Sequence, residues 1–171
     1  LPMPLGPALK QEFPDVQESV RMQEAWGESY VKIDGKVSRI GFTFADPGFF
    51  SVFDFKFKSG NPANALGDLH NVVLNQTTAR QLFGAENPVG KTFEVKWDDT
   101  FEPFTVTAVV DDLPSNSSIT FNMLGNYGYL ATTKNGKRSV DNWRRSSYFT
   151  FVRLREGSTL AKDPQRLLTF R

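Results

Sequence analysis

The stretch that decides the fold is Val72-Val73-Leu74-Asn75-Gln76-Thr77-Thr78-Ala79-Arg80-Gln81-Leu82-Phe83-Gly84, followed by Ala85-Glu86-Asn87-Pro88-Val89-Gly90-Lys91-Thr92-Phe93. Its apolar start predicts a strand. Residues 76–83 predict a helix, with Asn75 as the N-cap and Gly84 as the residue that ends it in the left-handed conformation. Phe93, Val95 and Trp97 alternate with charged residues and predict the next strand. The expected order is strand, helix, turn, strand.

The end of this stretch nearly matches the glycine-rich loop that binds nucleotide phosphates, G-x-x-x-x-G-K-[ST]. Gly90-Lys91-Thr92 supplies its last three positions, but the first glycine would fall on Ala85. The order of elements is also inverted, because a phosphate loop leaves a strand and opens a helix. We therefore interpret Pro88 and Gly90 as a turn and Lys91 as a solvated charge, and we expect no ATP to bind here.

Composition points to a compact chain without thiol chemistry. Its 171 residues suit one domain, or two small lobes that share one core. Sixteen phenylalanines predict an aromatic-rich core, and the net charge of +1 predicts no electrostatic attraction to nucleic acid. The absence of cysteine excludes disulfides and thiolate metal sites. No run of about 18 apolar residues predicts a transmembrane helix, and the first residues lack the pattern of a signal peptide.

Hydrophobic periodicity predicts an α+β fold in which strands are more abundant than helices. The Asp34-Gly35 pair predicts a hairpin turn. Expected helices cover 5–13, the short stretch 46–53 and a last helix opened by Asp163-Pro164, which is truncated at Arg171. Expected strands cover 16–22, 30–33, 37–44, 53–57, 106–110 and 148–154, and 125–136 is expected to be irregular and polar.

An ordered series of motifs resembles the periplasmic core domain of MacB-like ABC-transporter permeases, the FtsX-like group, in the versions common in Bacteroidota. The series begins with the strand at 72–74, Ala79, Leu82-Phe83-Gly84 and Pro88-Val89-Gly90-Lys91. The segments 49–55, 104–114 and 115–121 also match in order. One position departs, because Gln76 stands where the family pattern has threonine.

The resemblance implies a non-catalytic domain on the periplasmic side of the inner membrane that couples cytoplasmic ATP hydrolysis to transport, or to the handling of a substrate or lipoprotein. It implies a mixed α/β porter-like lobe and a smaller β-rich lobe. It also implies a cognate ATPase subunit or domain, a dimeric full-length protein and a periplasmic adaptor or lipoprotein as partner, with no cofactor and no nucleic acid. Phe83, Gly84, Pro88, Gly90 and Lys91 are then structural motif positions. The alternative is a secreted module that binds glycan or protein through exposed aromatics. Trp26, Trp97 and Trp143 could stack on sugar or lipid, but we interpret them as core or lobe-packing residues.

Residues with possible chemistry are few. His70 is the only histidine, and we interpret it as a surface residue. The pairs Asp98-Asp99 and Asp111-Asp112 stand at strand ends, where carboxylates cap turns. Arg144-Arg145 is interpreted as a solvated surface. The small polar run Ser115-Asn116-Ser117-Ser118 is either a hinge or partner contact, or a plain connecting loop.

Overall fold

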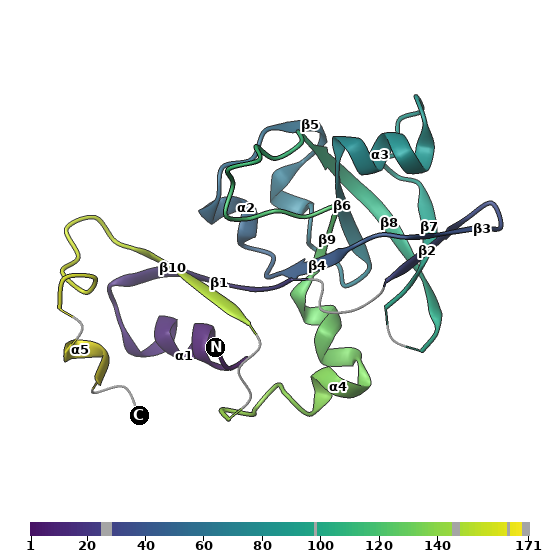
Figure 1. Ribbon diagram of the computed structural model, residues 1–171. Coiled ribbons are helices and arrows are strands. Elements are labelled where there is room, and N and C mark those ends of the chain that lie inside the picture. Colours follow the sequence, from purple (N-terminus) through teal and green to yellow (C-terminus); the bar gives the residue numbers. More distant parts are fainter. Residues whose placement is uncertain (25–28, 98, 145–147, 164, 169–171) are drawn as a thin grey trace.

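The computed structural model describes residues 1–24, 29–97, 99–144, 148–163 and 165–168 and places their strands in one mixed sheet (Figure 1). Ten strands are β1 Val16–Gln23, β2 Tyr30–Ile33, β3 Lys36–Arg39, β4 Phe42–Ala45, β5 Phe57–Gly60, β6 Asn71–Asn75, β7 Thr92–Lys96, β8 Phe101–Val110, β9 Met123–Asn126 and β10 Phe149–Leu154. Helices are α1 Leu5–Glu12, α2 Phe49–Val52, η1 Pro62–Asn64, α3 Gln76–Phe83, η2 Tyr127–Thr132, α4 Lys134–Lys137 and α5 Gln165–Leu168. The predicted α+β class, with more strand than helix, is confirmed.

The strand order is β10-β1-β4-β9-β6-β8-β7-β2-β3, and β5 pairs with β8 beyond this path. The pairs β4–β9 and β6–β8 are parallel, whereas the other pairs are antiparallel. We call the strands β2 to β9 the main sheet. The neighbours β6, β8 and β9 form its centre, and they are buried on both faces at 72–74, 108–110 and 123–126.

The deciding stretch folds as predicted into β6, α3 and β7. The Asn75 side chain accepts a hydrogen bond from the Thr78 backbone N–H at 2.8 Å, which confirms the N-cap. At the other end, the Gly84 N–H donates to the Arg80 carbonyl at 2.8 Å. Gly84 has the expected positive φ of 65°, but its ψ of −127° lies outside the left-handed helical region. The expected left-handed conformation is therefore correct in φ and wrong in ψ.

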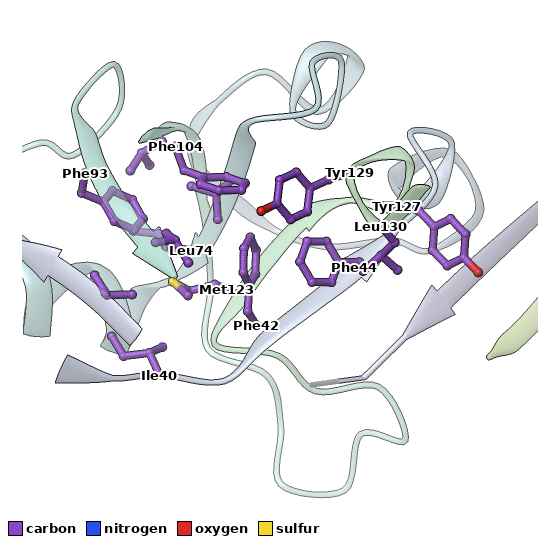
Figure 2. Close-up of a cluster of buried hydrophobic side chains, with 14 of the residues drawn as sticks. Ile40, Phe42, Phe44, Leu74, Phe93, Phe104, Met123, Tyr127, Tyr129 and Leu130 are labelled. Atoms are coloured by element: carbon purple, nitrogen blue, oxygen red, sulfur yellow. The ribbon is translucent and has the colours of Figure 1, made fainter. Parts of the chain in front are cut away.

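One face of the main sheet carries the aromatic core that the phenylalanine count predicts (Figure 2). The Phe104 ring centroid lies 5.3 Å from that of Phe42 and 5.2 Å from that of Tyr129. Phe44 stacks on Tyr129 at 5.7 Å. Edge-to-face and stacked aromatic pairs of this kind add to the free energy gained by burying the rings. Leu82 and Phe83 of α3 pack against the same core.

The opposite face carries a second cluster that is built around α2. Phe53 and Phe55 lie 5.0 and 5.2 Å from Phe49 between ring centroids. The predicted strand 53–57 is wrong for residues 53–56, because β5 begins only at Phe57. The rings at 53 and 55 alternate in burial as a strand would, but they gather around Phe49 while their backbone pairs with no strand. The expected helix at 46–53 is shorter and covers Phe49–Val52.

The expected strand 37–44 and the expected irregular stretch 125–136 are both wrong. The expected strand 37–44 is split into β3, which pairs with β2 at the sheet edge, and β4, which pairs with β1 and β9 in the interior. The Asp34–Gly35 hairpin turn is confirmed, with φ of 48° and 76°. The stretch 125–136 is neither irregular nor polar, because it holds the end of β9, η2 and part of α4 and buries Tyr127, Tyr129 and Leu130. The Asn126 side chain caps η2 by accepting from the Gly128 N–H, and the Thr133 side chain caps α4 by accepting from the Gly136 N–H.

The elements α1, β1, β10 and α5 lie together at one side of the molecule and form what we call the terminal unit (Figure 1). The predicted α1, β1 and β10 are confirmed. Phe13, Val16 and Leu160 are buried in a small cluster of their own. Helix α5 carries Arg166, whose guanidinium lies 2.8 Å from the Asp15 carboxylate. Pro164 and residues 169–171, which the expected last helix includes, lie outside the described residues.

No helix within the described ranges is long and apolar enough to cross a membrane.

Candidate functional site

The segment 111–122 connects β8 to β9 and contains the predicted hinge or contact run. Its first residues are held in place from two sides. The Asp111 N–H donates to the Lys56 carbonyl at 2.8 Å. The Asp112 carboxylate accepts hydrogen bonds from the backbone N–H and the hydroxyl of Thr77, both at 2.8 Å. Because Thr77 lies in the first turn of α3, the negative charge of Asp112 also interacts favourably with the positive N-terminal end of the helix dipole.

The end of the segment is fixed by burial. Ile119 and Phe121 are 8% and 5% exposed and belong to the α2 cluster. The Asn75 side-chain amide donates to the Phe121 carbonyl at 3.1 Å. Asn75 therefore caps α3 with its oxygen and holds segment 111–122 with its nitrogen. This double use follows from the amide group, which carries both a donor and an acceptor.

Between these anchors, the predicted run forms an exposed tip. Ser115, Asn116 and Ser118 are exposed, whereas Ser117 is half-buried. The Ser117 N–H donates to the Pro114 carbonyl at 2.9 Å, and its hydroxyl donates to the Ile119 carbonyl at 2.6 Å. Ser117 is thus the residue that closes the turn, while its three neighbours present side chains to solvent.

Two cavities flank segment 111–122. The first, of about 510 Å³, has an apolar floor of Phe53, Phe55, Leu113 and Ile119. The second, of about 530 Å³, lies on the α3 side and is more polar, with Thr43, Thr77, Asp112 and Asn122 among its lining residues. Cavities of this size suit a few side chains of a partner.

Charges at the rim of the first cavity are balanced. The Asp111 carboxylate lies 3.0 Å from the Lys58 ammonium and 3.7 Å from that of Lys56. Exposed ion pairs of this kind contribute little to stability. The rim therefore offers both signs of charge, and the apolar floor supplies the contact area.

The motif Phe83–Lys91 forms the connection between α3 and β7. Gly90 has a φ of 87°, and its N–H donates to the Val106 carbonyl at 2.8 Å, which ties the turn to β8. Pro88 is buried. The Lys91 ammonium contacts the Glu86 carboxylate and lies 5.5 Å from the Phe83 ring centroid. The hydrogen bond from Lys91 lowers the pKa of Glu86. The predicted helix-to-strand order of this loop is confirmed.

The other candidates are spread over the molecule. His70 is exposed, and its Nε2 lies 3.1 Å from the Glu102 carboxylate. Within the described ranges, no group of three or more His, Cys, Asp or Glu side chains could hold a metal ion. Trp97 packs against the aromatic core with its ring 5.0 Å from Phe44, whereas Trp143 is 50% exposed. Trp26, Asp98 and Arg145 lie outside the described residues.

A polar junction that the sequence did not predict lies where the terminal unit meets the main sheet. Its centre is Arg21 of β1, which forms a two-pronged ion pair with Asp46 at 2.8 and 2.9 Å and lies over the Tyr127 ring at 4.4 Å from guanidinium carbon to centroid. Burial acts to lower the pKa of Arg21, but the hydrogen bonds and charge of Asp46 outweigh it and raise this pKa above its usual value. The sequence gives little indication of this junction, because Arg21 is one charged residue in an alternating strand and its partners are distant in sequence.

Comparison with known proteins gives a consistent result. The family model of the MacB-like periplasmic core domain matches residues 1–167. A solved domain of a permease protein from Porphyromonas gingivalis is 26% identical, with a TM-score of 0.77 over 97% of this chain and 68% of that one. The periplasmic region of MacB from Actinobacillus actinomycetemcomitans is 19% identical, with a TM-score of 0.69 over 99% of this chain and 73% of that one.

A third solved structure extends the likeness of fold to Gram-positive bacteria. It is the extracellular domain of the noncanonic ABC-type transporter YknZ, which is 15% identical, with a TM-score of 0.60 over 93% of this chain and 78% of that one. A search of curated proteins finds no match.

Proposed function

Because the chain belongs to the MacB-like periplasmic core domain family, we propose that it relays movement between a cytoplasmic ATPase and a periplasmic partner. It is the periplasmic domain of a MacB/FtsX-like ABC transporter permease, and the family implies an ABC ATPase in the full-length protein. The family match over 167 residues is the observation that carries the proposal. We further propose that the full-length protein is a dimer in the inner membrane, with this domain on the periplasmic side.

We propose that the domain works without catalysis, by contact. The flanks of segment 111–122 support this role, because an apolar floor beside an exposed polar tip suits the binding of protein side chains. The partner would be a periplasmic adaptor or lipoprotein that inserts apolar side chains against Phe53, Phe55 and Ile119. The exposed residues Ser115, Asn116 and Ser118 would form the polar rim of that contact.

A cysteine-labelling experiment tests the relay without knowledge of the cargo. Residues 1–171 contain no cysteine, so Ser118→Cys places a single reporter in the domain of an otherwise cysteine-free full-length permease, purified with its ATPase in proteoliposomes. The rate of maleimide labelling is compared between the nucleotide-free state and the state trapped with Mg-ATP and vanadate. We expect the rate to change at Ser118→Cys and to stay constant at the exposed control Asn87→Cys. Equal rates in the two states at Ser118→Cys would contradict a relay through this segment.

A second arm tests the predicted hinge. Ser117→Pro removes the N–H that bonds Pro114 and the hydroxyl that bonds Ile119, and it fixes φ. Ser117→Ala removes the hydroxyl alone and serves as the matched control. We expect Ser117→Pro to abolish the vanadate-dependent change in labelling while ATP binding stays intact. An unchanged response, at normal abundance in the membrane, would leave the segment as a plain connection.

A further inference from the structure

The terminal unit joins the main sheet through a narrow connection. Strand β1 pairs with β10 over most of its length, but it pairs with β4 only at Met22–Ala45 and Gln23–Phe44. Two residue pairs of a ladder do not by themselves fix the angle between two units, because strands bend and twist readily at short contacts. Something else has to hold the terminal unit in its orientation.

One side of this connection is held by apolar packing. Val20 and Met22 point into the α2 cluster with Phe49, and Phe151 of β10 meets Phe53 edge to face at 5.1 Å. Apolar packing is non-directional, so it tolerates small rotations of the terminal unit. The directional contacts lie on the other face of β1, where Arg21 is found.

Arg21 contacts three separate segments at this face. Its guanidinium binds Asp46 just after β4 through two hydrogen bonds, covers the Tyr127 ring of η2, and donates to the Met3 carbonyl at 3.2 Å. Its aliphatic stem lies against α1 at Gly6, where an added Cβ would be 3.2 Å from the Arg21 Cγ. The small residue at position 6 therefore permits the close approach of the helix.

The backbone strengthens this arrangement. The Arg21 N–H donates to the Asp46 carboxylate at 2.8 Å, and the Asp46 N–H donates to the Arg21 carbonyl at 3.1 Å. Tyr127 in turn meets Tyr148 edge to face at 5.8 Å, and Tyr148 exchanges backbone hydrogen bonds with Leu1. A planar guanidinium with a two-pronged carboxylate partner has a fixed geometry, unlike an ammonium.

We infer that Arg21 is a positioning residue that fixes the angle of the terminal unit against the main sheet, so that displacement of the first residues is carried into the aromatic core. Met3, α1 and the core at Tyr127 then move as one body. The transmission part of this inference rests on the proposed relay function. The clamp itself depends only on the contacts of Arg21.

Spin labels on the 171-residue chain test the clamp. Gln11→Cys in α1 and Gln81→Cys in α3 are both exposed and report the distance between the terminal unit and the main sheet. With Arg21→Met, we expect the measured distance distribution to become roughly twice as wide, because a directional contact of the joint is lost. Arg21→Lys keeps the charge but not the two-pronged geometry, so the width of its distance distribution should lie between those of the parent and Arg21→Met.

Two further variants keep this test decisive. Arg21→Met/Asp46→Asn leaves no unpaired charge at the joint and should broaden the distribution as Arg21→Met does, even if the single variant fails to fold. Lys10→Met removes an exposed ion pair between α1 and β1, at 2.7 Å from Glu18, and should leave the width unchanged. A distribution as narrow as that of the parent in the folded double variant would overturn the clamp.

The transmission is tested separately in the full-length permease with Ser118→Cys. There, Arg21→Met should reduce the vanadate-dependent change in labelling by about fivefold or more. A full response together with a broadened distance distribution would overturn transmission through Arg21. If the parent shows no response, the relay function fails, while the distance measurement still decides the clamp.

Discussion

Replacing Gly84 separates a backbone effect from a packing effect at the end of α3. Its φ of 65° and ψ of −127° lie in a region that side chains with a Cβ avoid, and an added Cβ would meet nothing within 4 Å. The loss of stability in Gly84→Ala is then conformational strain of about 1–3 kcal/mol, because no neighbour is displaced. Gly84→Val should lie at the upper end of this range, since its branched Cβ restricts the backbone further.

The assay is thermal and urea unfolding of the 171-residue chain. For a chain of this size, each kcal/mol shifts Tm by about 2–4 °C, so a decrease of about 2–12 °C is expected. Gly48→Ala is the matched control, because Gly48 has a φ of −73° and the nearest atom to an added Cβ lies at 3.7 Å. It should cause no loss, and it should stabilise by up to about 1 kcal/mol through the unfolded state.

A third variant addresses ψ. Asparagine is tolerated in the left-handed helical region, but Gly84 lies outside that region, so Gly84→Asn should cost as much stability as Gly84→Ala. A Gly84→Asn protein as stable as the parent would show that α3 ends in the left-handed conformation after all. A parent-like Tm for Gly84→Ala would refute the strain argument itself.

Three other outcomes are expected. Calorimetry with Mg-ATP should show no binding, because Lys91 contacts Glu86 and Ala85 replaces a required glycine; micromolar binding that Lys91→Ala abolishes would overturn this. Leu82→Ala should lower the free energy of unfolding by about 1–3 kcal/mol, since Leu82 packs against the core, whereas exposed Gln81→Ala should change it by less than about 0.5 kcal/mol. Burial raises the pKa of the Tyr127 phenol, so above pH 10.0 the unfolded state loses this proton first, and the stability of the parent should fall relative to Tyr127→Phe by up to about 1.4 kcal/mol per pH unit; parallel pH profiles would contradict this.

The elements that the sequence predicted correctly are those whose signals are local. Helix α3 begins after Asn75, whose side-chain oxygen caps its first turn, and it ends at Gly84, which has a positive φ. Both signals lie within one turn of the helix. The Asp34-Gly35 turn is local in the same way. The errors arise where tertiary packing decides. Phe53 and Phe55 alternate like a strand, yet the aromatic rings around Phe49 hold their backbone away from any partner strand.

The candidate site shows the same difference between local signals and long-range contacts. The exposed tip of segment 111–122 could be proposed from its small polar residues, whereas its anchors could not, because Asp112 binds Thr77 across 35 positions and Asn75 binds Phe121 across 46. The joint at Arg21 is harder still. Asp46 and Tyr127 are 25 and 106 positions away, and nothing in their local sequence indicates a contact with Arg21. A relay needs such long-range contacts, since displacement is carried only between segments that touch in space. The residues that would transmit motion in this domain are therefore those that a local sequence pattern is least able to reveal.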